Sequence, residues 1–215
     1  MRTRSLSLVL SALVLSLAIA CGGGSSSTPS GSTPSAPPAT GLIYTNPTGT
    51  GWRLVKDASS TATRVILNLV GPSDLKTRGV GFNLQAPGTI KFGAFTNGMA
   101  INEGGVYQLL SAGSADPSEP VALIGGVKAG NLLTAGIFQK DRSQPAQDSG
   151  TTLCQIAVLF DATKGLHAGD KLPLQIIKAK VIPEDIGTIT DDLLTLDKKM
   201  KMADITIAVG SLTAN

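Results

Sequence analysis

The chain has 215 residues, of which 42% are hydrophobic, and 18 lysines and arginines against 15 aspartates and glutamates give it a net charge of +3. A nucleic-acid-binding surface needs a clustered excess of basic residues. The densest basic cluster here, at 198–201, closely follows Asp191, Asp192 and Asp197, so the sequence excludes nucleic acid as a partner.

The first twenty residues have the pattern of an export signal. Arg2 and Arg4 precede an apolar run at 6–19, and small residues follow it. The run of about 14 residues is too short for a bilayer-spanning helix, which needs about 20. Residues 17–21, Leu-Ala-Ile-Ala-Cys, resemble a bacterial lipobox, whose cysteine receives a diacylglycerol and becomes the new N-terminus. The resemblance implies a cleaved lipoprotein signal peptide at 1–20 and a lipid on Cys21. The alternative is an ordinary secretory signal with a coincidental cysteine.

The next segment has the composition of a tether. Residues 22–40 contain only Gly, Ser, Thr, Pro and Ala, so they cannot form a core and are expected to be disordered. Residues 21–40 are therefore predicted to be the lipidated cysteine and a linker that reaches roughly 25 Å. Gly22 follows Cys21 where the inner-membrane retention signal has an aspartate. By that resemblance, the predicted location is the cell envelope, at the outer membrane, facing the periplasm or the surface.

Processing leaves few residues for disulfide or metal chemistry. With Cys21 lipidated, Cys154 is the remaining cysteine, and no disulfide can form within the mature chain. Cys154 and His167 together fall short of the three or four nitrogen and sulfur ligands of a zinc site. Cleavage also removes Arg2 and Arg4, which lowers the net charge to about +1. No metal and no cofactor are predicted.

Residues 41–215 are predicted to form one domain built of short strands. Most segments alternate apolar and polar residues, as strands do when they cover a core on one side. At 172–181 the alternation changes phase, which indicates a β-bulge. A helix is expected within 184–200. Turn-rich breaks separate the segments, and this punctuation favours a sandwich or jelly roll. The predicted strands are 51–56, 65–70, 79–85, 89–95, 106–110, 121–124, 131–138, 152–160, 172–181 and 203–211.

Several of these segments together resemble a known family. Residues 79–84 read Gly-Val-Gly-Phe-Asn-Leu, and 152–160 and 169–176 pair a Thr-Leu-x-x-Ile pattern with Gly-x-x-Leu-Pro-Leu-x-Ile. In order and pattern, residues 60–182 resemble cohesin-like domains and the carbohydrate-binding modules that share their sandwich. The resemblance implies an all-β, jelly-roll-type β-sandwich. It also implies a non-catalytic scaffolding module, because a cohesin holds a small helical dockerin domain on one sheet face.

The sequence carries no recognisable catalytic constellation. His167 lies in a predicted exposed turn, and the Gly-x-Ser-x-Gly elbow of a serine hydrolase does not occur. Gly79-Val80-Gly81 lacks the third glycine of a dinucleotide-binding loop and lies within a predicted strand. The acidic pairs 184–185 and 191–192 do not have the spacing of a calcium loop, so a solvated surface is favoured for them. No catalytic residue is predicted.

Two classes of partner remain open. The first is a protein, either dockerin-like or another envelope protein. The alternative is a polysaccharide, for which Trp52 and Tyr44, and less directly Tyr107, would supply stacking rings. A single tryptophan is more often a core or edge residue, so the shortage of aromatic residues favours the protein. Cys154 shares its strand face with Ile156 and is expected to be a buried, inert thiol.

Overall fold

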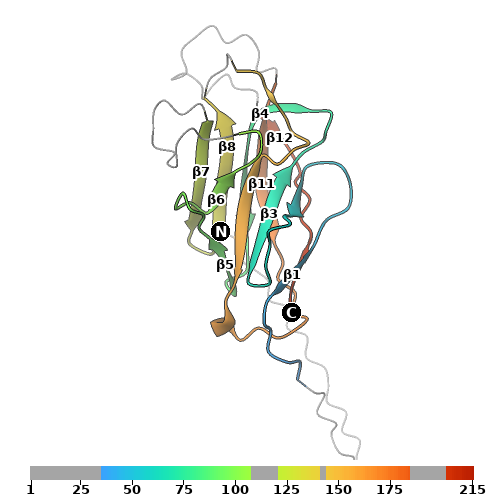
Figure 1. Cartoon of the computed structure of the whole chain (residues 1–215), viewed down its shortest axis with the longest axis vertical. Helices are drawn as coiled ribbons and strands as arrows, with labels where there is room; N and C mark the ends of the chain where they lie inside the picture. The colour runs from blue at the N-terminus through green and yellow to red at the C-terminus, as the bar shows by residue number, and fades with distance from the viewer. Residues whose placement is uncertain (1–34, 108–120, 141–143, 185–201) are drawn as a thin grey trace, which may run out of the picture. The chain divides into compact units, whose positions relative to one another are not determined.

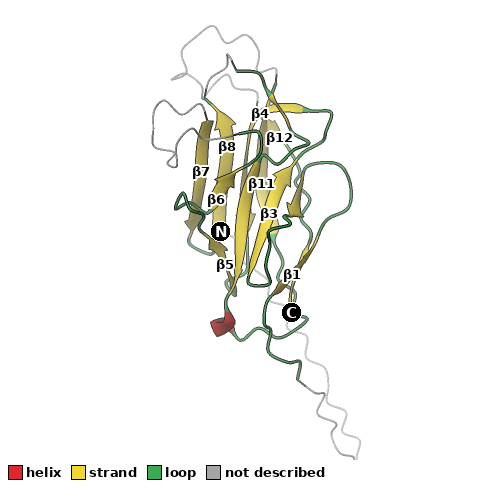
Figure 2. Ribbon diagram, viewed as in Figure 1, coloured by secondary structure: helices red, strands yellow, loops and turns green. Residues whose placement is uncertain are grey.

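The computed structural model describes residues 35–107, 121–140, 144–184 and 202–215, which belong to one unit, Ser35–Asn215. In these residues Figures 1 and 2 show strands joined by loops, with one short 3₁₀ helix, η1 (Ala162–Lys164). None of the helical structure in the described residues is long and apolar enough to cross a membrane.

The strands pair antiparallel in two larger sheets and one terminal pair. The first, named here the β3 sheet, has the order β2 (Arg53–Lys56), β3 (Arg64–Val70), β10 (Cys154–Phe160), β5 (Ile90–Gly93), and β6 (Ile101–Glu103) also pairs with β10. The second, the β4 sheet, has the order β12 (Ala203–Asp204), β11 (Gln175–Pro183), β4 (Lys76–Gln85), β8 (Leu132–Gln139), β7 (Val121–Lys128), with β9 (Gln147–Asp148) beside the start of β4. The terminal pair is β1 (Leu42–Thr45) with β13 (Ser211–Ala214).

The two sheets share one core. Leu67 of β3 and Ile156 of β10 lie in the same buried cluster as Phe82 of β4 and Ile137 of β8. Alternate residues of these strands face inward, which explains the period of two in the sequence. The all-β, jelly-roll-type β-sandwich predicted from the sequence is therefore confirmed. Cys154 lies on the inward face, fully buried, as predicted.

The predicted bulge in β11 is confirmed and lies at Ile177. Ile176 is opposite Leu84, and Lys178 is opposite Asn83, so Ile177 is the extra residue and its side chain is 54% exposed. A bulged residue is left out of the ladder, so nothing forces its side chain inward.

The prediction of one strand at 203–211 is also wrong. β12 ends at Asp204, and the chain then changes partners: Ile205 donates to the carbonyl of Ala179 at 3.1 Å, and Ala208 donates to the carbonyl of Trp52 at 2.8 Å. From Ser211 the chain pairs with β1. A segment that passes from one sheet to the other and then to the terminal pair cannot remain one straight strand.

The folded part begins before the predicted boundary at residue 41. The carbonyl of Pro37 accepts a hydrogen bond from Ala168, and the amide of Ala39 donates to Leu166 at 2.8 Å. Thr40 donates to the carbonyl of Asn215. Residues 37–40 therefore line the end of the sandwich beside β13, because their backbone groups find partners there.

Some strands were not predicted, some predicted strands have different ends in the structure, and some predictions concern residues that the structure does not describe. β1, β6 and β9 were not predicted, and β4 begins at Lys76, three residues before the predicted start. Of the predicted strand 106–110, Val106 and Tyr107 are in a bend, and Tyr107 is buried. Residues 108–110 and nearly all of the predicted helix at 184–200 lie outside the described residues.

Candidate binding groove on the β4 sheet

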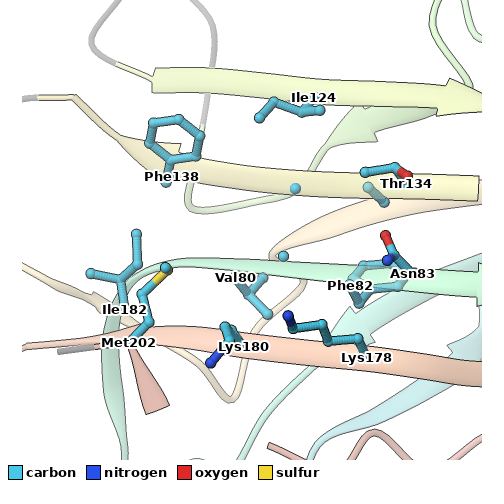
Figure 3. A pocket seen from close by; sticks show the side chains of 13 residues that line it. Val80, Phe82, Asn83, Ile124, Thr134, Phe138, Lys178, Lys180, Ile182 and Met202 are labelled. Atoms are coloured by element: carbon cyan, nitrogen blue, oxygen red, sulfur yellow. The ribbon is translucent and has the colours of Figure 1, made fainter. Parts of the chain in front are cut away.

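A cavity of about 330 Å³ lies on the solvent side of the β4 sheet, which is the side turned away from the core (Figure 3). The strands β11, β4, β8 and β7 supply nearly all of the lining residues, and Met202 lies just before β12. Most of these residues point outward, while Val80, Phe82 and Ala135 are buried in the core. The lining residues are Val80, Gly81, Phe82, Asn83, Ile124, Thr134, Ala135, Gly136, Phe138, Lys178, Lys180, Ile182 and Met202.

Strand register arranges the groove in rows that run across the sheet. In the middle row Gly81 lies opposite Gly136 on one side and Lys180 on the other, and Ile124 continues the row on β7. One neighbouring row contains Lys178, Asn83 and Thr134. Figure 3 shows Phe138, Ile182 and Met202 gathered at the opposite end. The groove therefore has a polar end, an apolar end and a floor without side chains.

The two floor glycines are not required by their neighbours. A Cβ atom on Gly81 would have its nearest contact, the carbonyl oxygen of Ala135, at 3.6 Å. On Gly136 it would lie 3.5 Å from the carbonyl oxygen of Val80. Both distances are ordinary van der Waals contacts. Glycine weakens a strand interior and often marks a place where a ligand or another backbone approaches closely. At Gly81 and Gly136 no other part of the described chain makes that approach.

Gly79, two residues earlier on β4, is different. A Cβ atom there would overlap Phe138, and would lie 2.7 Å from the carbonyl oxygen of Ile137. Gly79 therefore permits close packing within the fold, whereas the missing side chain of Gly81 leaves open space at the surface.

Apolar side chains surround the floor and remain accessible. Ile124 is 48% exposed and Met202 is 47% exposed, while Phe138 and Ile182 are half-buried. Exposed apolar residues that stand singly on a surface need no explanation, but a contiguous group of them marks an interaction site. Here the group lines one cavity, which makes it a candidate binding surface.

Two lysines of β11 supply the charge. The Lys180 ammonium lies 2.8 Å from the carboxylate of Asp204, and this hydrogen bond is the main cause that lowers the pKa of Asp204. Lys178 is exposed and, among the described residues, no carboxylate pairs with it. The bulge at Ile177 sets the phase that turns both lysines outward. The lining residues include no carboxylate.

The rings proposed for sugar stacking are in the core. Trp52 is 8% exposed and Tyr44 is 5% exposed, and both pack in the main cluster. The Tyr44 hydroxyl donates to the carbonyl of Leu54 at 3.0 Å and accepts from the amide of Gly210 at 2.7 Å. Burial raises the pKa of Tyr44 to about 12. Neither ring offers a free face to a polysaccharide, and Tyr107 is buried as well.

The remaining candidate residues lie apart from the groove lining. His167 is exposed in a turn, where its amide donates to Asp170 at 2.8 Å. Cys154 is enclosed in the core, and burial raises the pKa of its thiol to about 12. Cys21 lies outside the described residues. Of the acidic pairs, only Glu184 is described, and it is exposed.

Comparison with known proteins finds structural similarity only. No protein-family model matches the chain, and no curated protein matches it significantly. A type II cohesin of Acetivibrio cellulolyticus, solved in a cohesin–X-dockerin complex, has 9% identity over 75% of this chain and 95% of its own, with a TM-score of 0.46. The cohesin module of a Clostridium perfringens family 33 glycoside hydrolase has 8% identity over 75% and 99%, with a TM-score of 0.40. A non-cellulosomal cohesin of Archaeoglobus fulgidus has 10% identity over 74% and 86%, with a TM-score of 0.41. Similarity at this level identifies neither a family nor a partner.

Proposed function

We propose that this chain is a non-catalytic lipoprotein that presents a protein-interaction module at the cell envelope. A lipid on Cys21 anchors the chain to the membrane, and residues 22–36 act as the tether. Gly22, which stands where the inner-membrane retention signal has an aspartate, supports anchoring in the outer membrane. The outer face of the β4 sheet, around the groove, is the docking surface for a scaffolding partner. The partner that the sequence resemblance implies is a dockerin-like domain or another envelope protein.

The observation that carries this proposal is the open apolar groove with a glycine floor. A binding site in a sugar-binding sandwich needs exposed rings on which a saccharide can stack. The groove offers Phe138 alone, since Phe82 packs in the core, and Trp52 and Tyr44 are buried. An apolar centre bordered by polar and charged side chains is the usual arrangement of a protein-binding surface. The geometry therefore supports a protein better than a polysaccharide.

The test is photo-crosslinking of the full chain in the bacterium that produces it. A benzophenone amino acid replaces Thr134, which lines the groove, or Ile66, which is half-buried on the outer face of the β3 sheet and serves as the matched control. On irradiation, we expect the Thr134 position to give a discrete adduct that contains a second protein. The Ile66 position should give none of the same mass.

Two results would contradict the proposed function. If neither position forms a protein adduct in cells, the chain has no protein partner at the groove. If both positions trap the same proteins equally, contact is non-specific and the β4 sheet is not a docking surface. Mass spectrometry of the adduct identifies the partner, and protease digestion distinguishes protein from polysaccharide.

A further inference from the structure

The charges on the outer face of the β4 sheet are unequal. Lys128, Lys178 and Lys180 have outward strand positions, whereas Asp204 is the carboxylate that pairs with Lys180. The rest of the described groove lining is apolar or uncharged. An interface is most specific when opposite potentials meet, so the excess of cations favours a partner surface with carboxylates.

The positions of the lysines also determine how an acidic partner segment is oriented in the groove. Both Lys178 and Lys180 are on β11, along one side of the groove, while Ile124 and Phe138 come from β7 and β8 on the other side (Figure 3). A segment that fits must therefore have two different edges. Its acidic edge faces Lys178 and Lys180 of β11. Its apolar edge faces β8 and β7 and, at the apolar end of the groove, also Ile182 and Met202.

The size of the cavity above the glycine floor determines which side chain the apolar edge of the partner can insert. An apolar cavity of about 150 Å³ holds a benzene ring, so about 330 Å³ accommodates one or two bulky side chains such as leucine, isoleucine or methionine. Such a side chain can rest on Gly81 and Gly136 because neither position has a side chain that would occupy the space. Filling that space removes apolar surface of both molecules from water.

The Lys180–Asp204 ion pair indicates how Lys180 can bind a carboxylate of the partner. Asp204 is exposed and belongs to a strand of two residues at the edge of the sheet. Exposed ion pairs contribute little to stability, so a carboxylate of the partner can take the place of Asp204 beside Lys180 at low cost. Lys178 is available without any such exchange among the described residues.

We propose that the groove binds an acidic, amphipathic segment of a partner protein, which inserts a bulky aliphatic side chain over Gly81 and Gly136 and places carboxylates beside Lys178 and Lys180. This inference rests on the proposed function, since it specifies the chemistry of the partner at the same surface. Binding is driven by the apolar contact, and the lysines add specificity and a dependence on ionic strength.

The experiment selects peptides from a random phage-displayed library on the immobilised full chain. Selected peptides are then synthesised, and their dissociation constants are measured by fluorescence anisotropy at low and high salt. We expect enrichment of sequences that combine leucine, isoleucine or methionine with an excess of aspartate and glutamate. Affinity should fall as the salt concentration rises.

Matched variants assign the binding to the groove. Gly136→Val fills the floor, where its Cβ atom would lie 3.5 Å from the nearest backbone atom, and its control is Gly51→Val, at an exposed glycine outside the lining with open space around it. Lys178→Glu reverses one charge, and its control is Lys171→Glu at an exposed position outside the lining. We expect each groove variant to weaken binding by about tenfold or more, and the controls to bind as the unmodified chain does.

Selection of basic or uncharged peptides, or binding that is insensitive to Lys178→Glu, would contradict the inference that the partner segment is acidic. A second copy of the chain is the occupant if self-association is lost with Gly136→Val. Residues 185–201 are the occupant if replacing them with a Gly–Ser linker strengthens peptide binding. Either result overturns this inference. A Thr134 adduct in cells whose yield is unchanged by Lys178→Glu also overturns it, but leaves the proposed function standing.

Discussion

Lys178 lies opposite Asn83, one residue after the bulge at Ile177, and this pairing determines which side of the β4 sheet receives the two lysines of β11. From Lys178 onward, Ala179 and Val181 point to the core, and Lys178 and Lys180 point to solvent. A change of one residue in register would exchange these faces. The bulge therefore determines both which residues of β11 pack in the core and which charged residues line the groove.

Two single-residue deletions test this connection. Removing Ile177 joins Ile176 directly to Lys178, which is the spacing of a regular strand, so both pairings with β4 are kept and the fold should survive. Removing Ala179 brings Lys180 to the inward position opposite Phe82. A buried, unpaired ammonium should destabilise the domain by more than about 4 kcal/mol. Circular dichroism during urea unfolding measures the free energy of unfolding of each variant. If the two deletion variants were equally stable, the register of β11 against β4 would be contradicted.

Cys154 provides a probe of the core. Its side chain is fully buried beside Ile156. Cys154→Ala should cost about 1–2 kcal/mol, because it leaves a small cavity, and Cys154→Asp should prevent folding, because it buries an unpaired charge. The native thiol should not react with a bulky maleimide until the domain is unfolded in urea. Rapid labelling of the native protein would place Cys154 on the wrong face.

Alkaline pH should destabilise the domain through buried acids. Burial raises the pKa of Cys154 from about 9 to about 12 and that of Tyr44 from about 10 to about 12. Because the folded state holds these protons more tightly than the unfolded state does, their contribution to the free energy of unfolding is constant below about pH 9 and decreases as the pH rises to about 12. In Cys154→Ala the decrease should begin about one pH unit later, where Tyr44 first contributes. An unchanged onset would contradict the assignment.

The strands were predictable where one face packs in the core. At 79–85 the inward Val80, Phe82 and Leu84 alternate with glycines and polar residues, so the period of two is visible in the sequence. At 65–70 and 152–160 the inward positions are also apolar at every second residue, although some outward residues there are apolar as well. At 203–211 the residues also alternate, but the chain pairs in turn with β11, with Trp52 and with β1. A local sequence pattern could not reveal these changes of partner. Tyr44 was a candidate stacking ring because the sequence does not show that its hydroxyl is held in the core by the carbonyl of Leu54 and the amide of Gly210.

The groove could not be predicted, because it is made of outward residues from four strands that are distant in the sequence. Only register brings Lys178, Asn83 and Thr134 into one row. One signal was present: Gly81 and Gly136 are glycines within segments that were predicted as strands. A strand glycine has more than one explanation, however, as Gly79 shows, and the space around each decides between them.

The anchor is tested by substituting its cysteine. Cys21→Ala should leave an uncleaved precursor that incorporates no radioactive palmitate, because the thiol that receives the lipid is absent. Cys154→Ala is the matched control, and it should be lipidated and processed normally, since Cys154 is enclosed in the core. Labelling and gel mobility of the full chain report both outcomes. Unchanged palmitate incorporation in Cys21→Ala would show that the lipobox resemblance is misleading.

Trp52 separates the two classes of ligand. Its ring is buried against Gly71, where a Cβ atom would lie 2.9 Å from it, and its carbonyl accepts from Ala208. Trp52→Ala should therefore cost about 3–5 kcal/mol of folding stability and lower the melting temperature by several degrees or more. Trp52→Phe, which keeps most of the volume, should cost less. Retention of the full chain on insoluble polysaccharide should not depend on Trp52 beyond this loss of folded protein. If retention disappeared from a Trp52→Ala chain with unchanged circular dichroism and melting temperature, the ring would be a ligand platform, and the protein-binding function would give way to carbohydrate binding.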